Sequence, residues 1–199
     1  TINALTFDMS AAGAATFNDK IVATELDISG NVDVDGTLET DALTINGSAL
    51  NYKAFGTSSI MIGDNATGTI DAADNNTGVG VDVFAALTTG DNNVAVGKSA
   101  MTANTTGTAN VAIGSLALDA NTTDSYNIAI GHAALTTSDG GVGNTAVGYS
   151  AATSLSTGDY NVAIGYQALD SNTTASNNVG IGTNAGGALT TGASNVAIG

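Results

Sequence analysis

The residues that could carry chemistry in this chain are carboxylates, a single histidine and several tyrosines. A glycan-cleaving site would need two carboxylates working as an acid and a base. His132 is the only histidine, and no nucleophile motif surrounds it, so a Ser-His-Asp arrangement is not indicated. Carboxylates in turns are ordinarily solvated caps, and that is where the sequence places Asp91, Asp119, Asp124, Asp159 and Asp170. We therefore expect no catalytic residue and no enzyme.

Two short stretches have some character of a cation site. Asp91-Asn92-Asn93 offers oxygen ligands for a hard cation, but a single short cluster is weak evidence. The glycine-rich run 140–143 lacks the aspartate that calcium-binding β-roll nonapeptides require. We expect no metal and no cofactor.

The tyrosines are the one suggestive group. Tyr149 and Tyr166 follow His132 at intervals of 17 residues, and Tyr126 and Tyr160 share a second position relative to that interval. Exposed tyrosines can pack against sugar faces or a protein partner. The competing interpretation is that tyrosine is simply a good strand residue on an exposed surface. We predict these four tyrosines as candidate receptor contacts.

The same interval organises the whole chain. Asn161-Val-Ala-Ile-Gly165 recurs, with small changes, every 17 residues without insertion or deletion, as at 93–97, 110–114, 127–131, 144–148, 178–182 and 195–199. A fixed period of this size is the signature of a repeat architecture. We call the set of residues that occupy one position of the repeat a column.

Two columns separated by one residue are apolar along the chain. One is Ile or Val from residue 28 to residue 198, and the other, two residues earlier, is mostly Val, Leu or Ile. Because strand side chains alternate, these two columns share one face, and we predict that face as the core. The column between them is Ala or Gly from residue 78 onward. We expect it to point outward and to pack closely against a neighbouring copy of the chain.

The other columns complete a coil. Glycine after each strand allows a positive φ, and Ala followed by a larger apolar residue, as at Ala117-Leu118, indicates a second, less regular strand. Asparagine opens each coil, and stacked asparagines can hydrogen-bond along the axis. The predicted fold is all-β: a parallel β-roll or β-solenoid of 17-residue coils, intertwined or packed as a homotrimeric fibre. We predict an acidic β-rich lead-in over 1–50, a transition over 51–75 and the repeats over 76–199.

Composition excludes several partners. The formal net charge is −15, with three basic residues and no cysteine. Nucleic-acid binding needs cations that replace phosphate counterions, so we expect no nucleic-acid partner. No apolar run approaches the ~18–20 residues that span a bilayer, and we expect no membrane insertion.

The unit Asn-Val-Ala-Ile-Gly-x-x-Ala resembles the head repeat of YadA-like trimeric autotransporter adhesins. The longer form at 157–169, Thr-Gly-Asp-Tyr-Asn-Val-Ala-Ile-Gly-Tyr-Gln-Ala-Leu, is similar to repeats of bacteriophage tail-fibre proteins, including cyanophage proteins. This resemblance implies a homotrimer of left-handed β-rolls. It also implies a virion location, other tail proteins as neighbours, and a host glycan or protein as receptor.

The resemblance thus predicts a tail-fibre segment that acts as shaft and spacer in host attachment. The alternative within the same architecture is a bacterial surface adhesin. A third hypothesis is an ice-binding solenoid, because Thr89, Thr106, Thr123, Thr157, Thr174 and Thr191 share one column. Against it, these threonines stand in adjacent pairs at a turn, where a flat Thr-x-Thr strand face would be expected.

Overall fold

The computed structural model describes residues 44–45, 48–49, 52–55, 59–62 and 73–199. The described part is a β-solenoid, so the predicted all-β fold class is confirmed. The lead-in predicted over 1–50 lies outside the described residues, apart from β1 (Thr44–Ile45) and β2 (Ser48–Ala49), which pair antiparallel. No helix in the described part is long and apolar enough to cross a membrane.

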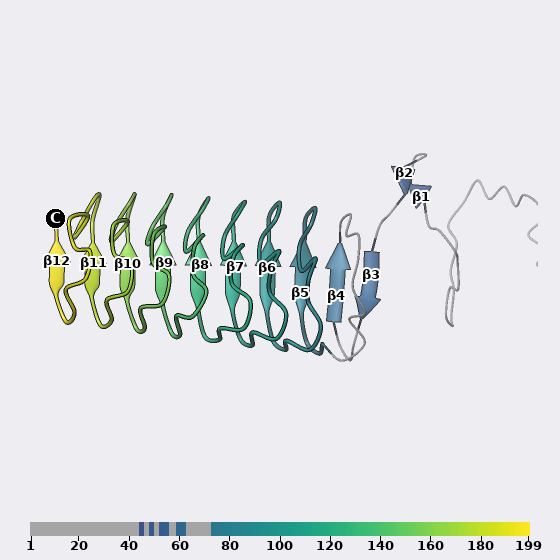
Figure 1. The fold of residues 1–199 in the computed structure, drawn as a ribbon. Helices are drawn as coiled ribbons and strands as arrows, with labels where there is room; N and C mark the ends of the chain where they lie inside the picture. Colours follow the sequence, from purple (N-terminus) through teal and green to yellow (C-terminus); the bar gives the residue numbers. More distant parts are fainter. Residues whose placement is uncertain (1–43, 46–47, 50–51, 56–58, 63–72) are drawn as a thin grey trace, which may run out of the picture. The chain divides into compact units, whose positions relative to one another are not determined.

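One ladder of strands runs along the solenoid (Figure 1). It begins with the antiparallel pair β3 (Tyr52–Phe55) and β4 (Ser59–Ile62). Every later strand is parallel to its neighbours and pairs with them at a register of 17 residues, as Val162 does with Thr145 and Val179. These strands are β5 (Thr77–Val79), β6 (Val94–Val96), β7 (Val111–Ile113), β8 (Ile128–Ile130), β9 (Thr145–Val147), β10 (Val162–Ile164), β11 (Val179–Ile181) and β12 (Val196–Ile198).

The predicted second strand does not form. Each coil contains one strand, and the described residues on its other side make turns. Leu118 has φ of 50° and Leu169 has φ of 51°, a left-handed conformation that costs an L-residue roughly 1–2 kcal/mol. Both side chains are completely buried, and full burial of a leucine contributes about 1.5–3 kcal/mol. Burial therefore offsets the strain, and the leucines enter the core from a turn.

The assignment of inside and outside was wrong. The middle residue of each inner strand is buried: Ala95, Ala112, Ala129 and Ala146 have no exposed surface, and Ala163 is 1% exposed. The flanking Val and Ile residues lie on the outer face, where Ile164 is 38% exposed and Ile113 is 39% exposed. The strands do alternate as expected, but the sides are exchanged.

The narrowness of the roll explains this exchange. The large residues of the turn column, among them Phe84, Met101, Leu118, Leu135 and Leu169, are fully buried and fill the interior. A Cβ added to Gly78 would lie 3.1 Å from the Phe84 ring, and one added to Gly180 would lie 2.7 Å from Cγ of Leu169. Only Ala or Gly fits opposite these side chains, because packed interiors leave no room for added methyl groups.

Glycine closes each strand, as predicted. Gly148 has φ of 140°, and a Cβ there would collide with the carbonyl oxygen of Gly165 in the next coil. The glycine column therefore satisfies both a left-handed backbone and the close stacking of successive coils.

A pair of adjacent substitutions tests which side of the strand is inside. Ala163→Asp places an unpaired charge in the core and should cost several kcal/mol, with loss of β-structure in the far-ultraviolet circular dichroism spectrum. Ile164→Asp places the same charge on the outer face and should leave that spectrum close to that of the unmodified chain. Equal loss of β-structure in the two variants would show that the outer face is not outside.

Candidate interaction surface

The outer face of the strands is the most continuous apolar surface of the described part. Its two columns flank the buried alanines, and eight parallel strands extend it over about 35 Å at ~4.8 Å per strand. The column that ends each strand is Ile or Val throughout; the column that begins each strand is Val or Ile except at Thr77 and Thr145. We call this surface the Val/Ile face. Soluble monomers rarely expose long contiguous apolar patches, so this surface is a candidate interface.

Buried asparagines hold the face straight. The backbone N–H of each asparagine in the column 93–195 donates to Oδ1 of the asparagine 17 residues earlier, as Asn144 does to Asn127 at 2.8 Å. The side-chain amide of Asn144 donates to the carbonyl of Gly158 at 2.8 Å, within its own coil. The predicted asparagine ladder is therefore confirmed, although most of its axial bonds join an amide oxygen to a backbone N–H. Side-chain to side-chain bonds occur at Asn161–Asn144 and Asn195–Asn178.

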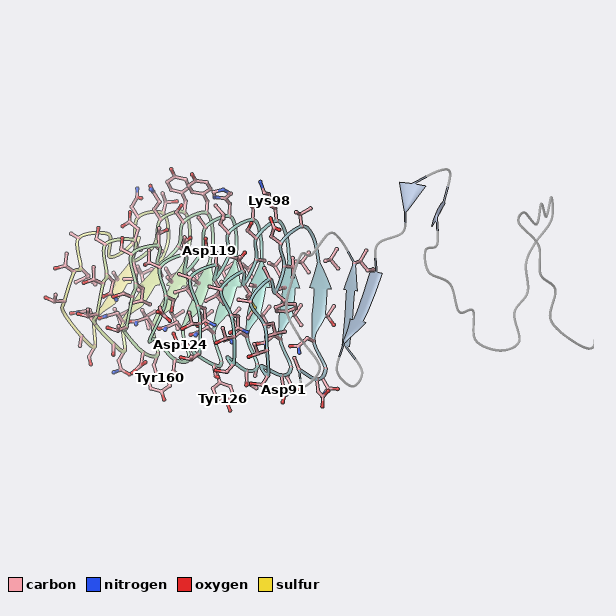
Figure 2. The ribbon with its side chains drawn as sticks, turned by 45° about the vertical axis from the view of Figure 1, so that its right-hand side comes forward. Asp91, Lys98, Asp119, Asp124, Tyr126 and Tyr160 are labelled. Carbon is pink, nitrogen blue, oxygen red and sulfur yellow. The ribbon has the colours of Figure 1, made fainter. Side chains whose placement is uncertain are left out.

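The tyrosines singled out in the sequence line the two long edges of the Val/Ile face. His132, Tyr149 and Tyr166 follow their strands, and their rings are stacked with centroids 5.3 Å and 5.4 Å apart. Tyr126 and Tyr160 precede the asparagine ladder on the opposite edge, and they are 66% and 62% exposed. The structure thus groups the four tyrosines in three consecutive coils but places them on two separate edges (Figure 2).

The carboxylates lie in the turns and serve the backbone. Asp91 accepts a hydrogen bond from the backbone N–H of Asp74 at 2.7 Å, and Asp159 accepts one from Val142 at 2.8 Å. Asp124 is buried and accepts from Gly140 and Gly141. In the part of the chain that the structure describes, no three His, Cys, Asp or Glu residues are grouped so that they could hold a metal ion.

The threonines of the ice-binding hypothesis form an exposed column. Their neighbours in the preceding column are used by the fold: Thr88, Thr105 and Thr173 each donate their hydroxyl to a carbonyl in the next coil. The exposed column itself is interrupted by Gly140. An interrupted array is a poorer match to a regular lattice than the sequence suggested, and ice binding stays a prediction.

Asp119 is an ionisable residue that the sequence did not distinguish from the other turn carboxylates. Its column neighbours donate their hydroxyls to a carbonyl 20 residues earlier, as Thr102 does to Asp82 at 3.1 Å and Thr153 to Ala133 at 3.3 Å. A carboxylate has no proton to donate, and the buried Oδ1 of Asp119 has no partner. Burial raises the pKa of Asp119, against the opposing effect of backbone N–H groups of Asp119 and Ala120.

Comparisons with protein-family models, with curated proteins and with solved structures give no match.

Asp119→Asn supplies the missing donor and should stabilise the fold near pH 7. One added net hydrogen bond contributes about 0.5–1.5 kcal/mol. Because the folded-state pKa of Asp119 is raised, the native protein gains stability as the pH falls through that pKa. The advantage of the variant should therefore shrink on acidification. Thermal melts of both proteins between about pH 7 and pH 4 test this, and a constant difference in melting temperature would contradict it.

Proposed function

We propose that this chain is a non-enzymatic segment of a homotrimeric fibre, a shaft and spacer in the host attachment of a phage tail or related virion appendage. The observation that carries the proposal is the Val/Ile face. It combines with the repeat resemblance noted in the sequence, which supplies the trimer and the virion context. Other tail proteins are then its neighbours, and a host glycan or protein is the receptor of the assembled fibre.

The chemistry of the Val/Ile face favours self-association. The face is straight and uniform, and side chains such as Val96 and Ile113 are β-branched and therefore stiff. Ordering them in an interface costs less side-chain entropy than ordering longer, more flexible residues would. Identical copies carry identical faces, and rotational symmetry brings three of them onto one axis. Burial of this surface then extends the hydrophobic contribution that one narrow roll makes alone.

The repetition favours a spacer. Each coil contacts only its neighbours, so length is set by copy number and stability adds up along the axis. The side chains that vary most, such as Lys98, Ser115 and Tyr149, lie at one edge of the strands. The core alanines and asparagines scarcely change.

A bacterial surface adhesin is the alternative with the same architecture. A membrane-anchor domain following these repeats in the complete reading frame would decide for the adhesin. A fibre tip or chaperone domain would decide for the phage fibre.

Sedimentation equilibrium of the full chain tests the assembly. We expect a species of three times the 19.3 kDa chain mass. Ile130→Asp should shift the equilibrium toward monomer, because it places a charge in each copy of the buried face. Thr123→Asp, an exposed change on a turn, is the matched control and should leave the mass unchanged. A well-folded monomer in the unmodified chain would overturn the proposal.

A further inference from the structure

The Val/Ile face has two long edges whose side chains point in opposite directions. The start edge lies two residues before each strand, and the end edge lies two residues after it. Figure 2 shows Tyr126, Tyr160 and the neighbouring Asp91 on one side of the roll and Lys98 on the other. The start edge is Asn75, Asn92, Ala109, Tyr126, Gly143, Tyr160, Asn177 and Ser194, and the end edge is Val81, Lys98, Ser115, His132, Tyr149, Tyr166 and Thr183.

The residue types at the two edges agree coil by coil. The coils of β8 and β10 have an aromatic ring at each edge, and the coils of β7 and β11 have small or polar residues at each edge. The four pairs are Tyr126 with His132, Tyr160 with Tyr166, Ala109 with Ser115, and Asn177 with Thr183. Nothing inside one copy explains this agreement, because the two edges are separated by the full length of a strand.

The coil of β9 combines small and large residues. Gly143 at its start edge leaves a gap between Tyr126 and Tyr160, and a Cβ there would lie 2.8 Å from the Tyr160 ring. At the end edge of the same coil, Tyr149 is the middle ring of the stack with His132 and Tyr166. The edge that lacks a side chain is thus matched by an edge that carries a large one.

Charges follow the same rule in the coil of β6. Lys98 at the end edge is the only basic residue between 73 and 199. Asp91 adjoins the start edge of that coil. One carboxylate oxygen of Asp91 accepts from Asp74, which leaves the other oxygen available to a cation. Within one copy the two residues stand at opposite ends of the strand, up to about 23 Å apart along an extended chain.

Symmetry brings the two edges together. In a closed ring of identical copies with the Val/Ile face on the axis, the end edge of one copy meets the start edge of the next at the same height. We propose that the partner of both edges is a second copy of this chain. The edges then interlock coil by coil, Tyr149 against Gly143 and Lys98 beside Asp91, and fix the axial register of the fibre. This inference rests on the homotrimer of the proposed function.

Self-association explains the edges better than a receptor does. A sugar or peptide bound at one edge would place no constraint on the residues of the other edge. The tyrosines also break a local rule: Tyr126 has φ of 65° and Tyr160 has φ of 54°, at a position where Asn or Gly is expected. Both rings are mostly exposed in one copy, so the packing that compensates for this conformation must come from outside it.

Paired cysteines test the register, because the chain has no cysteine of its own. Ala109→Cys with Ser115→Cys changes both edges of the β7 coil conservatively. The two positions are about 20 Å apart within one extended copy, and a disulfide needs Cα atoms within about 7 Å, so any link must join two copies. The offset control is Ala109→Cys with Thr183→Cys, displaced by four coils or about 19 Å along the axis.

We expect oxidation, or a short bis-maleimide, to convert most of the matched variant into covalent dimers and trimers on non-reducing gels. The offset variant should stay monomeric on the same gels. Sedimentation of both samples before treatment separates the two proposals. A trimer in which the matched pair fails to link, or links no better than the offset pair, overturns the edge pairing and leaves the trimer standing. A monomer overturns both.

Discussion

The structure depends on one buried interaction, the asparagine that joins each coil to the next. Its amide oxygen accepts the backbone N–H of the following asparagine, and its amide nitrogen donates to a carbonyl near the end of its own coil, as at Asn110. These groups have no access to water, so an unpaired one would cost about 1–3 kcal/mol. Paired, they fix the 17-residue length of every coil. A coil of any other length would misplace the next asparagine.

Constant coil length makes the roll narrow, and the narrowness decides which residues are inside. Large side chains enter from the turn, as Leu135 does, and the strand must then present alanine to them. The branched residues that strands favour are left on the outer face. The same constraint that builds one copy therefore produces the apolar surface on which the proposed assembly rests.

The sequence predicted the period, the parallel strands, the strand-closing glycines and the asparagine ladder, because each depends on a residue type repeated at one position. It did not predict orientation. Alternation tells which residues share a side of a strand, and the size of the side chains on the facing turn decides which side is inside. Leu118 was expected in a strand because its left-handed conformation conflicts with local preference and is offset only by burial. The tyrosines were found by their columns, whereas their separation onto two edges required the structure.

The central claim is that the Val/Ile face is covered by other copies of the same face. The most direct test is an isotope-filtered nuclear Overhauser measurement on a refolded mixture in which half of the chains carry ¹³C-labelled Val and Ile methyl groups. The account predicts contacts between labelled and unlabelled methyl groups along the whole face, including Ile113, Ile130 and Ile164. Contacts that involve only the buried alanines, or no contacts between chains at all, would contradict it.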